Sequence, residues 1–371
     1  QRQLKDNCSK DGWARGILNA NGISYPVRLR SKGDREIHRL SFNTMSFKAD
    51  IRGKKRYRGM EEFAIQMPII RNYTRELVAT KLMEDEGIVT PRQFYIRLFI
   101  NGEYVGLRHV EENFARELVE SSKRRYGPVF SLDEQSTDNL EDNKFDLADK
   151  KVWETSNRKI VMEALSILEA FRNDPIIFNK YFDLKLWAKY MASMDILQTY
   201  HGSIPKSVKF YLNPTTGLIE PVFYDGHQMN SSKEEDRIID LRLVDIIDPK
   251  IDLKNCGWIC GPNYKEVAWY RRIFGTSDNI NSPFYMNYLE SLEKYTSNEY
   301  INNKLMPIWQ GLSLERGMLY KEFWRVDRKL DKGKIIHIDT WSEFHYHLKR
   351  IRSEVEEARQ VQPLFSINNE G

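Results

Sequence analysis

Alternating apolar and polar positions dominate the first part of the chain. The segment ISYPVRLR (23–30) alternates, SFKADI (46–51) follows it, and EFAIQM (62–67) ends immediately before Pro68. Such alternation places apolar side chains on one face of a strand and polar side chains on the other. The pattern therefore predicts a sheet built from residues 23–66.

A helix and a hairpin are predicted next. RNYTRELVATKLMEDEG (71–87) has helical character, with Asn72 as a cap and Gly87 as a stop. The apolar runs FYIRLFI and YVGLRHV then flank Asn101-Gly102. This dipeptide between two apolar runs is a strong signal for a tight β-hairpin.

The character of the chain changes after this hairpin. Residues 132–158 are acidic and polar, which favours a linker or a flexible insertion. From residue 157 onward apolar residues recur at helical spacing, and a second hairpin is predicted around the turn at 214–217. We therefore expect an α+β fold with a β-rich N-terminal lobe containing one key helix, and a larger, mainly helical C-terminal lobe.

Charge is concentrated in the predicted sheet. The 371 residues carry a net charge of +4, too small by itself to imply a nucleic-acid-binding protein. From Arg28 to Arg58, however, eleven Lys and Arg residues face three acidic ones, a local net charge of +8. Such a patch suits the phosphates of a nucleotide, a nucleic acid or a lipid surface. The simpler alternative is a solvated face of the sheet.

Membrane and cysteine signals are weak. No run of about 18 apolar residues is present, so we expect no transmembrane segment in this chain. The chain starts at Gln1, and a signal or anchor upstream of it would not be seen. Cys256 and Cys260 are one residue too far apart for a CxxC redox pair, and Cys8 is remote in sequence. No matching His or Cys cluster accompanies them, which argues against a zinc site.

Lys48 and Glu76 are candidate partners. Lys48 lies on the strand SFKADI, and Glu76 borders an apolar stripe of the helix predicted at 71–86. Each is an ordinary surface residue in the simpler interpretation. In the functional interpretation the Glu76 carboxylate holds the Lys48 ammonium toward a phosphate.

Two aspartates are the other candidates. Asp195 either lies within a helix that continues through ILQTY, or starts a loop as a general base for a substrate hydroxyl. Asp225 precedes Gly226 at the end of the apolar run LIEPVFY. Asp-Gly is a common turn dipeptide, and the alternative is a metal ligand displayed at the end of a strand.

The order of these residues is more specific than any one of them. The chain has the same order of functional parts as a protein kinase. These parts are a lysine on a strand, a glutamate on a helix, a hairpin, an aspartate at the end of a helix, a second hairpin and an Asp-Gly dipeptide. No G-x-G-x-x-G loop precedes Lys48, and neither H-R-D nor D-F-G occurs. The sequence therefore excludes an ordinary protein kinase.

With these parts in place, the sequence resembles the CotH kinase-like family of atypical kinases. The resemblance covers about residues 23–230, and its most specific segments are INGEYVG and FYLNPTTGLIEPVFYDG. Other matching segments are VRLRSKGD, SFKADI, RGMEEFAIQMP, RNYTRELVATKLMEDEGIVTPR, RYGPVF and MDILQTYHGS. The resemblance implies an atypical protein-kinase-like two-lobed fold. It also implies ATP with Mg²⁺ or Mn²⁺, and phosphorylation of Ser or Thr hydroxyls on a protein substrate.

The resemblance also implies roles for individual residues. Matched by position, Asp195 is the catalytic aspartate and Asp225 the principal metal ligand. Lys48 lies on the strand that supplies the phosphate-binding lysine, with Lys32 as a competitor, and Glu76 is the expected partner.

The hinge and a second metal ligand are assigned in the same way. Glu111 and Glu112 fall where an inter-lobe hinge holds adenine and ribose. Ser207 stands where similar proteins place an asparagine that helps to bind a second metal ion. A serine hydroxyl is a poorer ligand, so a catalytically weak or inactive pseudokinase that binds a nucleotide or a partner is the alternative.

Two further activities remain open at this point. One is nucleotidyl rather than phosphoryl transfer, and the other is non-specific nucleic-acid binding through the basic patch, which we do not expect to be the function. The organisation we expect is an N-terminal extension (1–22), an N-lobe (23–112) and a C-lobe (113–371) that includes the polar insertion. Family habit places such proteins outside the cytoplasm, at the cell surface or with spores.

Overall fold

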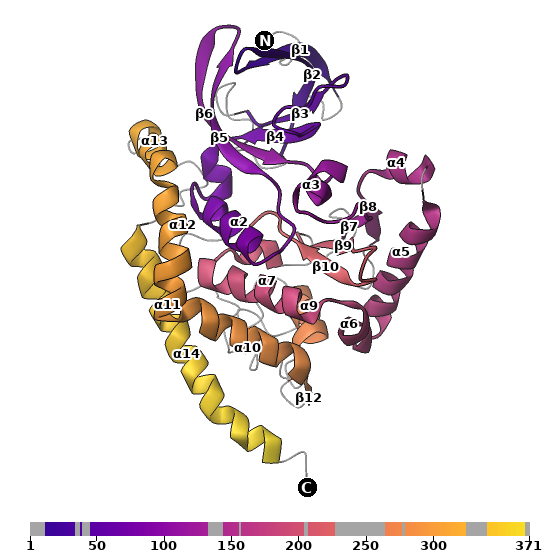
Figure 1. Cartoon of the computed structure of the whole chain (residues 1–371), viewed down its shortest axis with the longest axis vertical. Coiled ribbons are helices and arrows are strands. Elements are labelled where there is room, and N and C mark those ends of the chain that lie inside the picture. Colours follow the sequence, from indigo (N-terminus) through magenta and orange to yellow (C-terminus); the bar gives the residue numbers. More distant parts are fainter. Residues whose placement is uncertain are drawn as a thin grey trace.

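The computed structural model describes residues 12–33, 38, 45–132, 144–155, 157–203, 207–226, 264–276, 279–323 and 340–367. The sheet that contains β1 to β6 lies in the upper part of the molecule, and a second sheet lies with most of the helices in the lower part (Figure 1). Within the described ranges, no helix is both long enough and apolar enough to cross a membrane. The three cysteines lie outside these ranges.

Six strands form the upper, curled sheet (Figure 1). Their spatial order is β1-β2-β3-β4-β6-β5, and all neighbours are antiparallel. Along the chain they are β1 (Ala14–Ala20), β2 (Ile23–Ser31), β3 (Phe47–Ile51), β4 (Glu62–Gln66), β5 (Gln93–Ile100) and β6 (Glu103–Glu112). The strands predicted within 23–66 are therefore confirmed, whereas β1 was not predicted.

The two faces of this sheet differ as the alternation predicts. One face is apolar and packs Val27, Ala49, Ile51, Phe63 and Val110 into a single core with their neighbours. The other face is polar. On it, consecutive strands pair charged residues side by side, with Arg28 opposite Asp50 and Arg30 opposite Lys48.

The first hairpin is confirmed. Asn101 and Gly102 join β5 to β6, and their φ angles are 53° and 85°. Positive φ at both central residues is the type I′ geometry that Asn-Gly favours, because its twist matches that of the flanking strands.

The helix after the sheet starts later than the sequence predicts. A short 3-10 helix, η3 (Pro68–Arg71), comes first, and α2 (Arg75–Asp85) follows it. Asn72 is therefore not the cap of α2; it takes φ 47° and ends η3 instead. Gly87, with φ 82°, follows the end of α2 as predicted.

A second sheet and most helices build the lower part. The sheet has the order β10-β9-β7-β8, and the antiparallel pair β9–β10 confirms the second predicted hairpin. Its strands are β7 (Val129–Leu132), β8 (Phe145–Leu147), β9 (Lys209–Leu212) and β10 (Ile219–Val222). The helices up to residue 203 are α3 (Arg116–Ser121), α4 (Lys150–Thr155), α5 (Arg158–Asn173), α6 (Ile176–Tyr181), α7 (Leu184–Leu197) and η4 (Tyr200–Ser203).

Helices also dominate the last described part of the chain. They are α9 (Tyr264–Phe274), α10 (Ser282–Thr296), α11 (Asn298–Tyr300), the π-helix η6 (Ile301–Leu305), α12 (Met306–Gly311), α13 (Ser313–Phe323) and α14 (Trp341–Ile367). Two short strands, β11 (Gly275–Thr276) and β12 (Asn279–Ile280), pair after α9.

Helix α7 is the centre of the lower core. Trp187 is fully buried, and its indole Nε1–H donates to the carbonyl of Ile219 on β10 at 3.0 Å. The same core includes α2 and α10, and both helices pack against α7. The position of α2 is therefore fixed by the helical part as much as by the sheet.

Glu86 fixes the end of α2. Its carboxylate accepts hydrogen bonds from Lys294 at 2.7 Å and from the Tyr300 hydroxyl at 2.6 Å, and it pairs with Lys189 at 3.1 Å. These partners come from α7, α10 and α11, so one carboxylate ties α2 to three helices.

The polar segment 132–158 is not wholly a linker, contrary to the sequence prediction. Within its described residues, β8 pairs with β7 and α4 buries Trp153. The Trp153 ring stacks on Tyr126 with their centroids 4.6 Å apart. A single large aromatic residue is enough to anchor this otherwise polar stretch.

Helix α13 returns from the helical part to the upper sheet, beside β6 in Figure 1. The carboxylate of Glu322 accepts the backbone N–H of Leu107 at 2.6 Å and the hydroxyl of Tyr104 at 2.5 Å. Leu319 and Phe323 pack beneath it against the η3 region. The sheet is therefore closed on this side by a helix that comes late in the chain.

Candidate functional site

A buried arginine lies where η3 leaves the sheet. Arg71 is the last residue of η3, and Asn72 and Tyr73 after it take φ angles of 47° and 54°. Two successive left-handed residues turn the chain sharply before α2 begins. Only 3% of Arg71 is exposed, so its guanidinium points into the protein and must find its partners there.

The Arg71 guanidinium contacts three carboxylates from three different parts of the chain. Its Nη2 donates to Glu111 Oε2 on β6 at 2.7 Å, and its Nε lies 3.5 Å from Glu76 Oε2 on α2. Its Nη1 donates to Asp225, just after β10. We call these four residues the Arg71 cluster; it joins the upper sheet, α2 and the lower hairpin.

The cluster is extended by two neutral amides and one lysine. Gln66 Nε2 donates to Glu111 at 3.2 Å, and Gln93 Nε2 donates to Glu76 at 3.1 Å. Lys32 Nζ lies 3.5 Å from Glu111 Oε2 and is 30% exposed. Lys32 therefore connects the buried cluster to solvent.

The two glutamates respond differently to this shared cation. For Glu76, burial is the larger effect and raises the pKa to about 8, although Arg71 opposes it. For Glu111, burial also disfavours the charged form, but Arg71, Lys32 and His109 outweigh it and lower the pKa to about 2. The shorter Arg71 contact belongs to Glu111, which agrees with this division. Near neutral pH, Glu111 is the charged partner and Glu76 is largely protonated.

Asp225 lies in the irregular segment after β10, at the lower edge of the cluster. β10 ends at Val222, and Asp225 takes φ 56°, the left-handed region that Asp tolerates better than most residues. Its Oδ2 lies 2.9 Å from His201 Nδ1 and 3.4 Å from the Ser207 hydroxyl. Ser207 also lies 3.0 Å from His201 Nδ1. Asp225 therefore lies in the irregular segment that follows β10, and its role as a metal ligand stays a prediction.

These side chains fit one divalent cation better than two. Magnesium is commonly held by one or two carboxylates, with substrate phosphates and water completing its shell. Asp225 supplies the carboxylate and Ser207 a hydroxyl oxygen beside it. Within the part of the chain that the structure describes, no group of three His, Cys, Asp or Glu side chains is placed to hold a metal ion. The protein's own ligands are therefore few, and phosphate oxygens would complete the set.

The predicted pair of Lys48 and Glu76 does not form. Lys48 Nζ pairs with Glu62 Oε2 on the adjacent strand at 2.7 Å, and the carboxylate of Glu76 is turned to Arg71 instead. The reason is register: Lys48 lies opposite Arg30 of β2 and Ala64 of β4, where β4 also supplies the Glu62 carboxylate. Of the two competing lysines, Lys32 is the one beside the cluster.

Asp195 lies within α7, which continues to Leu197, so it does not start a loop. It is 2% exposed, and its Oδ2 accepts a hydrogen bond from the Tyr288 hydroxyl of α10 at 2.5 Å. Its backbone carbonyl lies 2.9 Å from His347 Nε2, whose pKa burial lowers to about 4. Neutral His347 donates this hydrogen bond. Asp195 therefore contacts α10 and α14, whereas Asp225 contacts Arg71.

The two predicted hinge glutamates serve as ion-pair partners. Glu111 belongs to the Arg71 cluster, and Glu112 accepts hydrogen bonds from Arg92 Nε at 2.9 Å and from the Arg92 backbone at 3.0 Å. Both residues lie in β6 and pair with β4. Their carboxylates are thus occupied by arginines, and a role in adenine binding stays a prediction.

Sequence reasoning missed Arg71 and the involvement of His201. Arg71 lies five residues before Glu76 in a non-periodic stretch, so amphipathic patterns do not mark it. The signal that could have found it is the lone arginine after PII, between a strand and a helix. His201 lies in the segment MDILQTYHGS, where no sequence pattern marks it as a partner of Asp225.

The chain belongs to the CotH kinase protein family, because the model of that family matches residues 27–361. The match extends well beyond residue 230 and includes most of the C-terminal helices. The family is one of kinase-like proteins, which agrees with the kinase-like order of parts in the sequence. No curated protein matches the chain.

Proposed function

We propose that this protein is an ATP- and divalent-metal-dependent phosphotransferase that phosphorylates Ser or Thr hydroxyls of a protein substrate. The upper sheet with α2 serves as the N-terminal lobe of a two-lobed kinase-like fold, and the helical part serves as the C-terminal lobe. The observation that carries the proposal is the Arg71 cluster. It brings together the α2 glutamate and the Asp-Gly aspartate, two parts that the kinase-like order predicts to act together.

The polar face of the upper sheet supplies positive charge for a triphosphate. Lys32 lies at the edge of the cluster, and Arg30 and Lys48 lie further along the same face. Preorganised cations stabilise the charge that develops on a transferring phosphoryl group. In this proposal Lys32 is the principal phosphate-binding lysine, because Lys48 is paired with Glu62.

Asp225 and Ser207 would hold the divalent ion, which when bound neutralises phosphate charge and orients the triphosphate. Arg71 balances the charge of Asp225 in the structure described here. Nucleotide binding therefore requires the Asp225 carboxylate to be shared between Arg71 and the incoming cation. Asp195 has the proposed role of orienting the acceptor hydroxyl and accepting its proton.

A catalytically inactive, nucleotide-binding pseudokinase is the second candidate, and two observations favour it. Asp195 is buried and hydrogen-bonded to Tyr288, so a substrate hydroxyl reaches it only if α7 and α10 separate there. Ser207 replaces the family asparagine and already lies within reach of Asp225 and His201. Both candidates require nucleotide binding, and only the first requires turnover.

Calorimetric titration of ATP with MgCl₂ or MnCl₂ tests the shared requirement. We expect metal-dependent binding to the unchanged chain and its loss in Asp225→Asn. Glu84→Gln is the matched control, because Glu84 is 60% exposed and, among the residues that the structure describes, its carboxylate pairs only with Lys81 on the surface of α2. Absence of metal-dependent binding in the folded, unchanged chain would contradict both candidates.

Labelled ATP then separates the candidates. Transfer of the γ-label to protein that disappears in Asp195→Asn, with ATP binding retained, supports the phosphotransferase. Transfer of an α-label would show nucleotidyl transfer instead. Binding without transfer of either label supports the pseudokinase.

A further inference from the structure

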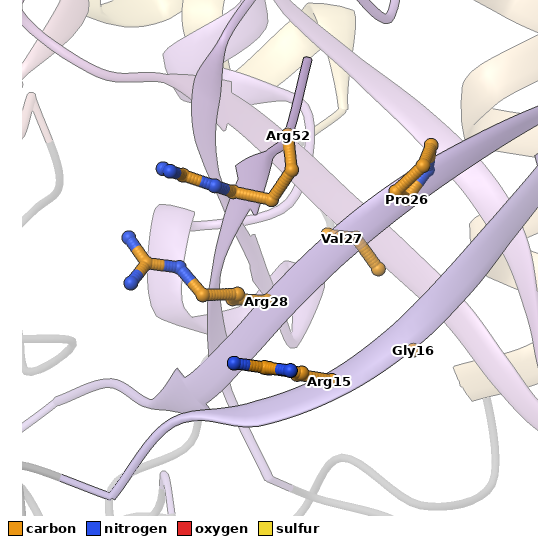
Figure 2. Close-up of a pocket in the computed structure, with 6 residues that line it drawn as sticks. All are labelled: Arg15, Gly16, Pro26, Val27, Arg28 and Arg52. Carbon is orange, nitrogen blue, oxygen red and sulfur yellow. The ribbon is translucent and has the colours of Figure 1, made fainter.

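Three arginines on the polar face of the upper sheet line one pocket. Arg15 of β1, Arg28 of β2 and Arg52 after β3 line a pocket of about 460 Å³, together with Gly16, Pro26 and Val27. Figure 2 shows the three side chains extending in the same direction from neighbouring strands. None of these residues belongs to the Arg71 cluster.

One carboxylate, that of Asp50, contacts two of these three guanidinium groups. Asp50 is 3% exposed, and its Oδ2 accepts a hydrogen bond from Arg28 Nε at 3.1 Å and from Arg52 Nη1 at 3.2 Å. In the part of the chain covered by the structure, no hydrogen bond or ion pair is found for Arg15. The pocket therefore carries an excess of two positive charges.

This arrangement is unfavourable without an anion. Arg15 and Arg28 lie directly opposite each other in the β1–β2 register, and like charges at such positions destabilise a sheet. The Arg28 guanidinium also lies 4.8 Å from the centre of the Trp13 ring, which holds it in place. Charges on edge strands protect sheets from aggregation, but Arg28 lies inside the sheet, so edge protection does not explain the pocket.

The chemistry of the pocket fits a phosphate monoester. At neutral pH such a group carries a charge of about −1.5 to −2, which matches the local excess, and its oxygens suit the forked geometry of guanidinium groups. Convergence on one pocket suits a single dianion better than the evenly spaced phosphates of a nucleic acid.

The neighbouring strand indicates what carries the phosphate. β1 is the last strand on its side of the sheet, so among the described residues its outer edge pairs with no other strand. An extended peptide can pair its backbone with such an edge, which a nucleic acid cannot do. Ile17, two residues from Arg15 on β1, is 69% exposed and offers an apolar contact beside the pocket.

We propose that the pocket formed by Arg15, Arg28 and Arg52 binds the phosphoserine or phosphothreonine side chain of an extended peptide that pairs with β1. The site is a docking site and lies apart from the Arg71 cluster. It goes beyond the proposed function, because phosphopeptide binding requires neither ATP nor catalysis.

Fluorescence anisotropy with a labelled eight-residue Ala/Val peptide tests the proposal. The probe has phosphoserine at its centre, and the comparison peptide has serine. We expect the phosphopeptide to bind at least about tenfold more tightly, and Arg15→Gln or Arg52→Gln to reduce its affinity about tenfold, the effect of one lost charge-assisted contact. Arg97→Gln is the matched control, because Arg97 is an exposed residue of β5 at the opposite edge of the same sheet. It should change the affinity less than twofold.

Two further probes test the kind of ligand. Two phosphopeptides are compared, one N-methylated at the odd residues and one at the even residues. Their affinities should differ, because only one of these two sets of backbone amides faces β1. Asp225→Asn should leave phosphopeptide binding unchanged, which separates this proposal from the proposed function. Equal affinity for the serine and phosphoserine peptides, or equal loss in Arg15→Gln and Arg97→Gln, would overturn the proposal. So would tighter, Arg15-dependent binding of single-stranded oligothymidylate, or unchanged binding of both N-methylated peptides.

Discussion

Arg71→Gln is the most informative single substitution in this protein. It replaces a guanidinium that contacts Glu76, Glu111 and Asp225 with a shorter, neutral amide. The three carboxylates come from α2, β6 and the irregular segment after β10. The substitution therefore leaves acidic groups facing one another at the junction of the upper sheet and the lower hairpin.

The size of the effect follows from burial. Removing one partner of a buried ion pair costs about 3–5 kcal/mol, because the remaining charge is left without compensation. Here Glu76 is largely protonated at pH 7, since its pKa is about 8, and Glu111 keeps Lys32 and Gln66 as partners. Asp225 is 15% exposed and can regain some hydration. We therefore expect a loss near the lower end, about 3 kcal/mol.

Urea unfolding at pH 7, followed by tryptophan fluorescence and circular dichroism, measures this loss. Arg97→Gln is the control, and as an exposed substitution it should change the free energy of unfolding by about 0.5 kcal/mol or less. Asp225→Asn combined with Arg71→Gln should cost less than the sum of the two single changes, because the two side chains contact each other. An Arg71→Gln loss no larger than that of Arg97→Gln would refute the reasoning, since it would mean that the carboxylates are solvated despite their burial.

Three other predictions concern Glu76, Glu86 and the two lysines of the polar face. Because burial raises the folded-state pKa of Glu76 to about 8 from 4.5, folding takes up a proton between these values. In urea unfolding, the free energy of unfolding of the unchanged chain minus that of Glu76→Gln should therefore fall from pH 5 to pH 8. A difference that stays constant over this range would contradict the raised pKa of Glu76. Glu86→Gln should cost about 2 kcal/mol by losing charged hydrogen bonds to three helices, whereas Glu84→Gln should cost about 0.5 kcal/mol or less in the same assay. In ATP titrations, Lys32→Met should weaken binding about tenfold and Lys48→Met less than threefold, and the reverse order would return the phosphate-binding role to Lys48.

Local sequence patterns predicted the strands and hairpins well, because neighbouring residues determine the alternation of a strand and the type of a turn. Alternation marks the faces of β2, β3 and β4, and Asn101-Gly102 specifies a turn that few other dipeptides adopt. The strand β1 was missed because most of its residues are exposed and its sequence, ARGILNA, has no regular alternation.

The pairing of charges depends on register and on irregular backbone, which sequence patterns do not encode. Lys48 and Glu76 have the right types and the right order, but β4 supplies Glu62 as a nearer carboxylate for the lysine. The cation that does reach Glu76 comes from a 3-10 turn ended by two left-handed residues. A position of this kind becomes visible only when the backbone path is known.

The contact between Glu322 and Leu107 has a consequence for the synthesis of the protein. The two residues are 215 positions apart, and the late one satisfies a backbone N–H of the early one. While the chain emerges from the ribosome, β6 is complete long before α13 exists, and the side that α13 later covers stays open to water or to chaperones. The upper sheet therefore cannot reach its final state as an independent early unit. Fragments that stop before residue 313 should leave the ribosome with an uncovered apolar surface around Leu107 and Tyr73, and should aggregate where the full chain folds.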